Sequence, residues 1–336
     1  MTAANLGALP PKWARFCLGV ESFLLEELGF SPRGYAFVLA FSGGLDSTAL
    51  AHILRILSPR LGTSLTAAHL DHGLREESAR EAAVVQAACG ELGIDCATQR
   101  RDAAAAARKS GQGVEAAARS VRYAFLEEVR AAHAPAIVVT AHQQNDLAED
   151  VLMRLSRGTG WPGLGGMPAW DPARHLLRPL LMTPRSVLKA FLDDMGVSYL
   201  TDPSNADRRF TRNRIRESIL PLFLEENPNF LETAGRLWRQ AAMDEAWFSR
   251  ELGAYPGPDG AARVLLEERR LRALSPALRL RLFKKILDGL GPGESLAKTL
   301  LALETAFAGK RRGTVFQFPG KKTASVTREG VAFQRE

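Results

Sequence analysis

The sequence predicts an α/β protein built on a doubly wound parallel sheet, followed by a smaller, mainly helical and basic C-terminal region. Apolar runs of strand length alternate with helical apolar spacing through the first half of the chain, which is typical of a parallel sheet covered on both faces. The formal net charge of +7 falls entirely within residues 231–336, because residues 1–230 sum to zero. The two parts of the chain therefore differ in net charge.

The first predicted strand is YAFVLAF (35–41), a continuous apolar run. Apolar residues from Leu45 to Leu57 follow it at helical spacing, so a helix comes next. The same alternation predicts strands at 64–70, 94–99 and 136–141, each followed by a helix.

The later chain is predicted to be largely helical. Residues 156–182 are rich in Gly, Pro and Trp and predict a long ordered loop. Helices are expected from Pro184 to about Arg250, interrupted by the turn-rich TDPSNADRR (201–209), and again up to about Phe307. Two short strands close the chain, at 313–318 and 323–327. We expect a catalytic domain over residues 1–225 and a basic region over 226–336, with a turn-rich linker at 254–261.

Composition bounds the class of protein. The chain has 336 residues, 46% hydrophobic and 24% charged, which suits a globular protein large enough for two domains. No segment approaches the roughly 18 consecutive apolar residues of a membrane span, and we expect a cytoplasmic protein. The three cysteines are never spaced as CxxC, so neither a disulfide framework nor a zinc site is indicated.

The basic end suggests a partner. Residues 261–336 hold 16 Lys and Arg against 7 Asp and Glu, an excess of 9 positive charges in a short segment. Such an excess favours a polyanion, and nucleic acid more than membrane, because no strongly amphipathic anchor is evident. A basic tail that serves only solubility is the alternative that composition leaves open.

The stretch SGGLDS (42–47) links the first strand to its helix. Glycines at 43 and 44 let backbone N–H groups converge on a ligand, and the helix N-terminus adds positive potential, so the turn favours phosphate. It lacks the lysine of a Walker A loop. Asp46 would repel phosphates unless Mg²⁺ lay between them, whereas its ordinary alternative is a first-turn acid on a helix.

SGGLDS resembles the PP-loop of the N-type ATP pyrophosphatases, which have a Rossmann-like fold. Further stretches resemble, in order, those of the tRNA(Ile)-lysidine synthase family across about residues 35–230. These stretches are AAHLDHGLR (67–75), GVEAAARSVRY (113–123), TAHQQNDLAED (140–150), RGTGWPGLGGM (157–167), LRPLL (177–181) and DPSNADRRFTRNRIRESILP (202–221). The resemblance implies a ligase that joins free L-lysine to C2 of the wobble cytidine in the CAU anticodon of a minor isoleucine tRNA. ATP adenylates the C2 oxygen, with Mg²⁺, and is consumed as AMP and pyrophosphate.

The resemblance also implies roles for particular residues. The phosphate cradle comprises Ser42, Gly43, Gly44, Leu45, Asp46 and Ser47. The expected catalytic residues are Asp46, Arg119, Arg122, His142 and Asp146, of which Asp46 and Asp146 are the expected metal ligands. The expected substrate-binding residues are Glu149, Arg212, Asn213 and Arg216.

Spacing agrees with several of these roles. Arg119 and Arg122 lie three apart on a predicted helix and share a face suited to phosphate. His142, Asp146 and Glu149 stand at i, i+4 and i+7, where a strand ends and a helix begins. The ordinary alternatives are a solvated arginine pair, a helix-capping histidine and a first-turn acid.

Two more groups are expected near the site. His69, Asp71 and His72 end the second predicted strand, where contacts to the adenine or ribose or a structural turn are both reasonable. The basic stretch from Arg208 to Arg216 is expected to face RNA or lysine, and Phe210 within it either stacks on a base or is buried in the core.

The run at 140–150 departs from the family's usual AHHxxDQxET. Gln143 replaces the second histidine, Asn145 an optional aspartate and Leu147 a glutamine, while Asp150 replaces threonine. Two alternatives stay open: another PP-loop enzyme such as a tRNA thiolase, which is expected to need reactive or cluster-binding cysteines, and a tRNA-binding protein with impaired chemistry. Oligomeric state is not readable from the sequence, and a homodimer stays open.

Overall fold

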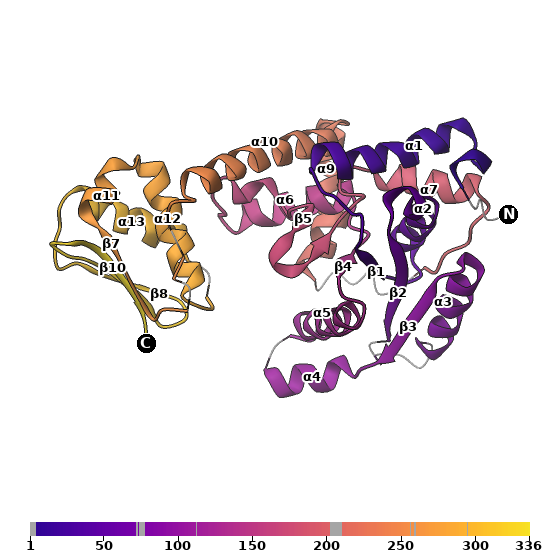
Figure 1. Cartoon of the computed structure of the whole chain (residues 1–336), viewed down its shortest axis with the longest axis horizontal. Helices are drawn as coiled ribbons and strands as arrows, with labels where there is room; N and C mark the ends of the chain where they lie inside the picture. The colour runs from indigo at the N-terminus through magenta and orange to yellow at the C-terminus, as the bar shows by residue number, and fades with distance from the viewer. Residues whose placement is uncertain are drawn as a thin grey trace. The chain divides into compact units, whose positions relative to one another are not determined.

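The computed structural model describes residues 5–71, 73, 78–111, 113–201, 210–255, 257–258, 260–293 and 295–336 (Figure 1). Its contacts divide the chain into two compact units. Unit 1 comprises Met1–Met153 and Gly166–Arg236, and unit 2 comprises Arg154–Gly165 and Leu237–Glu336.

Unit 1 is built on a six-stranded sheet, in the order β3-β2-β1-β4-β6-β5. All neighbouring strands pair in parallel except the two-residue β5, which is antiparallel to β6. The predicted doubly wound parallel sheet is therefore confirmed. Its strands are β1 (Ala36–Ala40), β2 (Ser64–Asp71), β3 (Asp95–Arg100), β4 (Ala136–Val139), β5 (Trp170–Asp171) and β6 (Leu176–Leu177).

The strand order reverses at β1, which pairs with β2 on one side and β4 on the other. Connections leaving β1 and β3 run in opposite directions along the sheet, so a crevice opens at the carboxyl ends of β1 and β4. The helices that follow the strands are α2 (Leu45–Leu61), α3 (Ser78–Leu92), α4 (Ala103–Ser110), α5 (Val114–Ala132) and α6 (Gln144–Ser156). Such a crevice is where open α/β sheets bind ligands.

The sheet is buried on both faces because side chains alternate along each strand. Val38 packs against Phe125 and Leu126 of α5, whereas Phe37 and Leu39, its neighbours in β1, point the other way and are fully buried. Helix α2 packs with α1 (Pro11–Ser22) and α7 (Arg185–Asp194), and Figure 1 shows these three helices on the side of the sheet away from α5.

The Gly-, Pro- and Trp-rich region predicted as a loop contains short elements. Besides β5 and β6 it holds two turns of 3₁₀ helix, η3 (Gly163–Gly165) and η4 (Pro172–Arg174). The helical segments after α7 are α8 (Thr211–Arg214), the π-helical η6 (Ile215–Ile219), α9 (Leu220–Glu226) and α10 (Phe230–Glu251), which runs from unit 1 into unit 2. Residues 202–209 of the predicted turn lie outside the described residues.

Unit 2 combines helices with a four-stranded antiparallel sheet, in the order β7-β10-β9-β8. The two predicted strands correspond to β8 and β9. The expectation of helix at 263–267 is wrong, because this segment pairs with the chain's last strand and alternates Val264 and Leu266 toward the core. The elements are β7 (Arg263–Glu267), α11 (Glu268–Ala273), α12 (Pro276–Gly289), α13 (Ala297–Ala308), β8 (Val315–Phe318), β9 (Lys322–Val326) and β10 (Gly330–Arg335).

A buried ion pair joins α12 to α13 inside unit 2. The Arg279 guanidinium donates to both oxygens of Glu304, with Nη2 to Oε1 at 2.6 Å and Nε to Oε2 at 2.9 Å. The Arg279 Nη1 also donates to the carbonyls of Leu271 and Leu274, which end α11. The pair therefore fixes three helices around the Phe283, Phe307 and Phe333 core.

Among the described residues, no helix has both the length and the apolar character needed to cross a bilayer.

Glu304→Leu is predicted to destabilise unit 2 by about 3–5 kcal/mol, because it leaves the Arg279 charge buried and unpaired. Hydrogen exchange of the α12 and α13 amides measures the loss. Glu267→Leu, which removes an exposed pair with Arg270, should cost about 0–1 kcal/mol. The double variant Arg279→Met/Glu304→Leu should regain part of the loss, since it removes the unpaired charge but also the donor to the Leu271 and Leu274 carbonyls, and a double variant as unstable as Glu304→Leu alone contradicts this account.

Candidate active site

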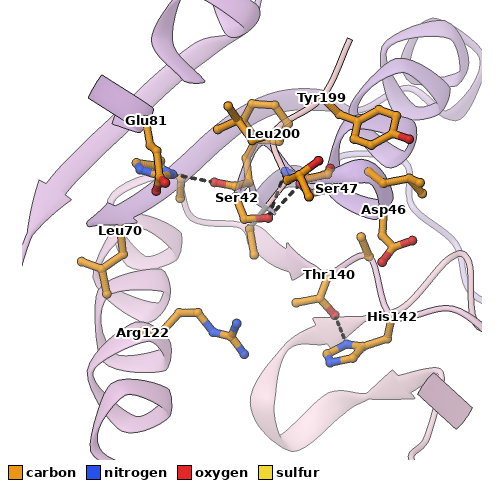
Figure 2. Close-up of a pocket in the computed structure, with 18 of the residues that line it drawn as sticks. Ser42, Asp46, Ser47, Leu70, Glu81, Arg122, Thr140, His142, Tyr199 and Leu200 are labelled. Carbon is orange, nitrogen blue, oxygen red and sulfur yellow. Dashed lines mark hydrogen bonds between the residues drawn. The ribbon is translucent and has the colours of Figure 1, made fainter. Parts of the chain in front are cut away.

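A cavity of about 1070 Å³ opens at the carboxyl edge of the unit 1 sheet. It is lined by the loop after β1, the end of β2, one side of α5, the residues after β4, and the first turns of α7 (Figure 2). Of the predicted site residues, the cavity lining contains Ser42, Gly44, Leu45, Asp46, Ser47, Arg122, His142 and Arg216. The structure thus brings together residues from several separate motifs.

The loop after β1 requires glycine at position 43. Gly43 has a φ of +76°, and a Cβ there would lie 2.9 Å from the Leu200 side chain and 3.0 Å from that of Val85. Its carbonyl accepts hydrogen bonds from the Leu200 N–H at 2.8 Å and the Thr48 hydroxyl at 3.1 Å. Close packing and two hydrogen bonds to Gly43 therefore fix the loop backbone that faces the cavity.

Two serines brace the same loop. The Ser42 and Ser47 hydroxyls lie 3.1 Å apart, and Ser47 also donates to the Gly44 carbonyl at 3.0 Å (Figure 2). Gly44 caps α2 with extended backbone, so the first N–H groups of α2 have no intrahelical acceptors. This arrangement of N–H groups and helix dipole favours an anion.

Asp46 occupies the first turn of α2 and lines the cavity. Its Oδ1 is buried without a hydrogen-bond partner among the described residues, and the nearest cation is the Arg185 Nε at 3.6 Å. Burial raises the pKa of Asp46 to about 6, against the opposing effect of Arg185. A buried oxygen of this kind is a ready cation ligand.

His142 follows β4 and faces the cavity (Figure 2). Its Nδ1 shares a hydrogen bond of 2.8 Å with the Thr140 hydroxyl, which orients the ring. Burial, and secondarily the nearby Arg178 and Arg212, hold the pKa of His142 well below its usual value. The imidazole is therefore neutral at pH 7.

The two predicted arginines of α5 are placed differently. Arg122 lines the cavity, and burial lowers its pKa from the ordinary value. Arg119 is exposed on α5 and is absent from the cavity lining. Both guanidiniums lie near the Tyr123 ring, at 5.0 Å for Arg119 and 5.4 Å for Arg122, so this ring helps to orient both cations.

Four charges form a compact cluster behind the cavity. Arg212 Nε donates to Glu149 Oε2 at 2.8 Å and its Nη2 to Asp146 Oδ1 at 2.7 Å. Arg216 Nε donates to Glu149 Oε1 at 2.6 Å and its Nη2 to Asp146 Oδ1 at 3.2 Å. Glu149 is 1% exposed, and burial raises the pKa of Asp146. Helix α6 is thereby joined to the α8–η6 segment by hydrogen bonds between oppositely charged side chains.

The residues at 143 and 145 that depart from the family serve the backbone. Gln143 is 1% exposed, and its Oε1 accepts from the Asn145 N–H at 2.6 Å while Asp146 Oδ2 accepts from the Gln143 N–H at 3.0 Å. These two hydrogen bonds cap the start of α6. Asn145 Oδ1 accepts from the Arg185 N–H at 3.1 Å, and Leu147 is fully buried.

The end of β2 also reaches the cavity. His69 and Asp71 both line it. His69 Nδ1 contacts the Phe41 carbonyl at 3.0 Å, and Asp71 Oδ1 accepts from the Gly73 N–H at 2.7 Å. Both side chains therefore have structural contacts at the cavity wall, whereas His72 lies outside the described residues.

The arginine-rich stretch is described in part. Arg208 and Arg209 lie outside the described residues. Phe210 precedes α8 as its N-cap and is half-buried, and Asn213, also half-buried, lies on α8. Among the described residues, no group of three or more His, Cys, Asp or Glu side chains is placed to hold a metal ion.

Motif reasoning missed part of the cavity wall. Its further lining residues include Glu81, Thr140, Arg185, Ser186, Lys189, Tyr199 and Leu200. Arg185 and Lys189 recur at i and i+4 on α7, a spacing that is visible in the sequence but common on helix surfaces. Only the packing of α7 on α2 shows that they face the phosphate loop.

The fold and the loop together define a class. Residues 23–223 match the PP-loop domain family. The geometry of the loop after β1 suits the ATP that this family uses. A solved U34-tRNA thiolase from Methanococcus maripaludis shares the fold, with a TM-score of 0.56, 15% identity, and coverage of 67% of this chain and 77% of that one. Unit 1 is thus a PP-loop ATP pyrophosphatase domain.

Sequence similarity narrows the class further. A tRNA(Ile)-lysidine synthase of Nitratidesulfovibrio vulgaris is 44% identical over 91% of this chain and 94% of that protein. One from Salinispora tropica is 35% identical over 94% of each. One from Geobacillus kaustophilus is 37% identical over 72% of this chain, and the match covers 52% of that relative. The chain belongs to the tRNA(Ile)-lysidine synthase family.

The buried charge of Asp46 predicts a pH-dependent stability cost. Because its pKa rises from an ordinary 3.8 to about 6, the folded chain binds the proton more tightly than the unfolded chain. Stability from this group therefore falls as pH rises from about 4 to about 6 and stays low above that range. Asp46→Asn should raise the free energy of unfolding by about 1–3 kcal/mol at pH 8 and by almost nothing at about pH 3. Denaturant unfolding at both pH values measures this, and an equal gain at both contradicts it.

Proposed function

We propose that the chain ligates lysine to C2 of the wobble cytidine in the CAU anticodon of a minor isoleucine tRNA, consuming ATP. The observation that carries the proposal is the braced PP-loop opening, with Asp46, into the same cavity as His142 and Arg122. Membership of the lysidine synthase family supplies the substrate class, which is tRNA(Ile).

The proposed reaction has two steps. The C2 oxygen of the cytidine attacks the α-phosphorus of ATP, a C2–O–P linkage forms, and the bond to the bridging oxygen breaks to release pyrophosphate. The lysine ε-nitrogen then attacks C2, a carbon–nitrogen bond forms, and the carbon–oxygen bond breaks as AMP leaves. Activation is needed because the C2 oxygen is otherwise a poor leaving group.

ATP is proposed to lie with its phosphates on the loop formed by Ser42, Gly43 and Gly44, continued by Leu45 and Ser47. The free N–H groups at the start of α2 face these phosphates. Mg²⁺ would neutralise phosphate charge during adenylation. Of the two expected ligands, Asp46 has a buried oxygen without a hydrogen bond, whereas both oxygens of Asp146 already accept hydrogen bonds.

Cations and a neutral base complete the proposed chemistry. Arg122 lines the cavity and suits the charge that develops on the α-phosphate, and Arg119 on the same helix adds positive potential. His142 is neutral at pH 7, with a pKa lowered by burial. Because it lines the same cavity as the phosphate loop, it is proposed to accept the proton that the lysine nitrogen loses on attack.

The lysine site is proposed at the four-charge cluster. Free lysine carries a carboxylate and an ammonium on the same carbon, and the Glu149 carboxylate with the Arg212 and Arg216 guanidiniums complements such a zwitterion. Arg216 lines the cavity and gives the cluster its access to it. Asn213, on the same segment, is proposed as a further substrate contact.

The tRNA is proposed to engage the basic C-terminal region, residues 226–336. The 16 Lys and Arg within residues 261–336 supply the charge that a polyanion requires. The loop at residues 309–313, between α13 and β8, carries three consecutive exposed basic residues. A tRNA substrate is also the reason to propose a cytoplasmic location.

The two alternatives have less support. The thiolase shares the fold at 15% identity, while the near-full-length relatives are lysidine synthases. The hypothesis of impaired chemistry rests on the departures from the family at Gln143 and Asn145. Both side chains accept hydrogen bonds from backbone N–H groups at the edge of the site. His142, Asp146 and Glu149 are retained.

The function is tested by following label from lysine into a CAU-anticodon isoleucine tRNA with Mg²⁺ and ATP. We expect stoichiometric AMP release and incorporation, and no incorporation when ATP is omitted. A family member of known activity serves as the control for the tRNA. Absence of incorporation at every protein concentration, with that control active, sinks the proposal.

Asp46→Ala in the same assay should lower AMP formation at least about 100-fold while tRNA affinity changes less than about threefold, because the carboxylate serves the nucleotide. Glu91→Ala, which removes an exposed acid on α3, is the matched control and should keep full activity. Equal loss of tRNA binding in Asp46→Ala would contradict its assigned role.

Replacing Lys310, Arg311 and Arg312 with glutamine should weaken tRNA binding and flatten its salt dependence. Each lost phosphate contact should reduce the slope of log K against log salt by about 0.7–0.9. Removing the exposed Arg108 and Lys109 from α4 in unit 1 is the control and should leave the slope nearly unchanged. Binding isotherms across a salt series give the slopes, and identical slopes in the loop variant and the wild type would disprove the assignment.

A further inference from the structure

Two cations on α7 face the phosphate loop, and no motif pointed to them. Arg185 and Lys189 lie one helical turn apart and line the cavity together with Ser186. The Arg185 Nε lies 3.6 Å from Asp46 Oδ1. Since Asp46 occupies the first turn of α2, this distance places the guanidinium beside the phosphate loop.

Arg185 sits on a segment that is fixed at both ends. At its start, the Arg185 N–H donates to Asn145 Oδ1 at 3.1 Å, which ties the first turn of α7 to α6. Beyond its end, the Leu200 N–H donates to the Gly43 carbonyl at 2.8 Å, and Gly44 forms an isolated bridge with Leu200. The backbone that carries both cations is therefore held against the loop from both ends of the segment.

The Arg185 side chain has donor capacity to spare. Within the described parts of the chain, its one ion pair is that with Asp46, which is longer than a hydrogen bond, and the side chain is 47% exposed. A guanidinium carries five N–H donors in a fixed fork that matches phosphate oxygens. Lys189 adds a second cation, although its Nζ also contacts Asp193 at 2.7 Å.

We propose that Arg185, assisted by Lys189, binds the β- and γ-phosphates of ATP and holds the pyrophosphate that leaves. The inference rests on the proposed function. As the bond between the α-phosphorus and the bridging oxygen breaks, the electron pair stays on that oxygen, and pyrophosphate gains negative charge. The fork of Arg185 stabilises this charge, while the adenosine and its α-phosphate lie toward other elements, the end of β2 and Arg122.

This assignment also explains the contact with Asp46. Without nucleotide, Arg185 and Asp46 offset part of each other's charge across 3.6 Å. With ATP bound, the phosphates would provide a stronger anion for the guanidinium, and the Asp46 carboxylate would then be left to hold a divalent cation. Arg185 is therefore a phosphate-binding residue of the adenylation step and not only a partner of the carboxylate.

The test compares inhibition by the two products, inorganic pyrophosphate and AMP, in the full-length chain. Arg185→Ala should raise the inhibition constant for pyrophosphate at least about tenfold, the loss of one charge-assisted contact, and leave that for AMP within about twofold. Arg185→Lys should fall between, and Lys189→Ala should show a smaller shift of the same kind. Arg174→Ala is the control, because Arg174 Nε pairs with Asp171 at the similar distance of 3.8 Å away from the cavity.

Equal shifts for pyrophosphate and AMP, or no shift for either, would overturn the inference, since Arg185 would then act only through Asp46 or not at all. Arg185→Gln replaces the alanine variant if the latter unfolds below the assay temperature. Direct titration with pyrophosphate separates this inference from the proposed function. Pyrophosphate binding that Arg185→Ala abolishes, in a chain that makes no lysidine, would retain the phosphate site and reject the ligase, whereas active variants with unchanged pyrophosphate constants reject only the site.

Discussion

Balancing buried negative charge at the carboxyl edge of the sheet is the constraint on which the site depends. Asp46, Asp146 and Glu149 all lie near this edge, and an uncompensated buried carboxylate costs several kcal/mol. The compensating guanidiniums belong to Arg185, Arg212 and Arg216, which come from helices much later in the chain. The helices α2 and α6 are therefore held to α7 and α8–η6 by charge as well as by apolar packing.

The balance is incomplete at one point, and that point faces the cavity. The cluster around Glu149 satisfies its own donors and acceptors, whereas Asp46 Oδ1 has only a distant guanidinium. A site that must receive both an anion and a cation gains from such an arrangement, because the ligands complete what the protein leaves unsatisfied. The cost to stability and the capacity to bind thus have one origin.

Polar residues near the site divide into those that face the cavity and those that hold the backbone. Gln143 and Asn145 belong to the second group, since one caps α6 and the other caps α7 through the Arg185 N–H. Neutral side chains serve these caps without adding negative charge beside Asp146. Unit 2 shows the same division, with Arg279 buried against Glu304 while the basic loop after α13 stays exposed.

The strand-and-helix alternation of unit 1, the glycine loop and the position of Asp46 could all be predicted from the order of the amino acids. These depend on side-chain periodicity and on local backbone demands, such as the positive φ of Gly43, which can be read over a few residues. Three features could be seen only once the chain was folded: Arg185 and Lys189 face the loop, Gln143 is a cap, and β7 pairs with β10. Each of these is a contact set by strand order and helix packing between distant segments, and a local pattern carries no record of which distant partner a side chain will meet.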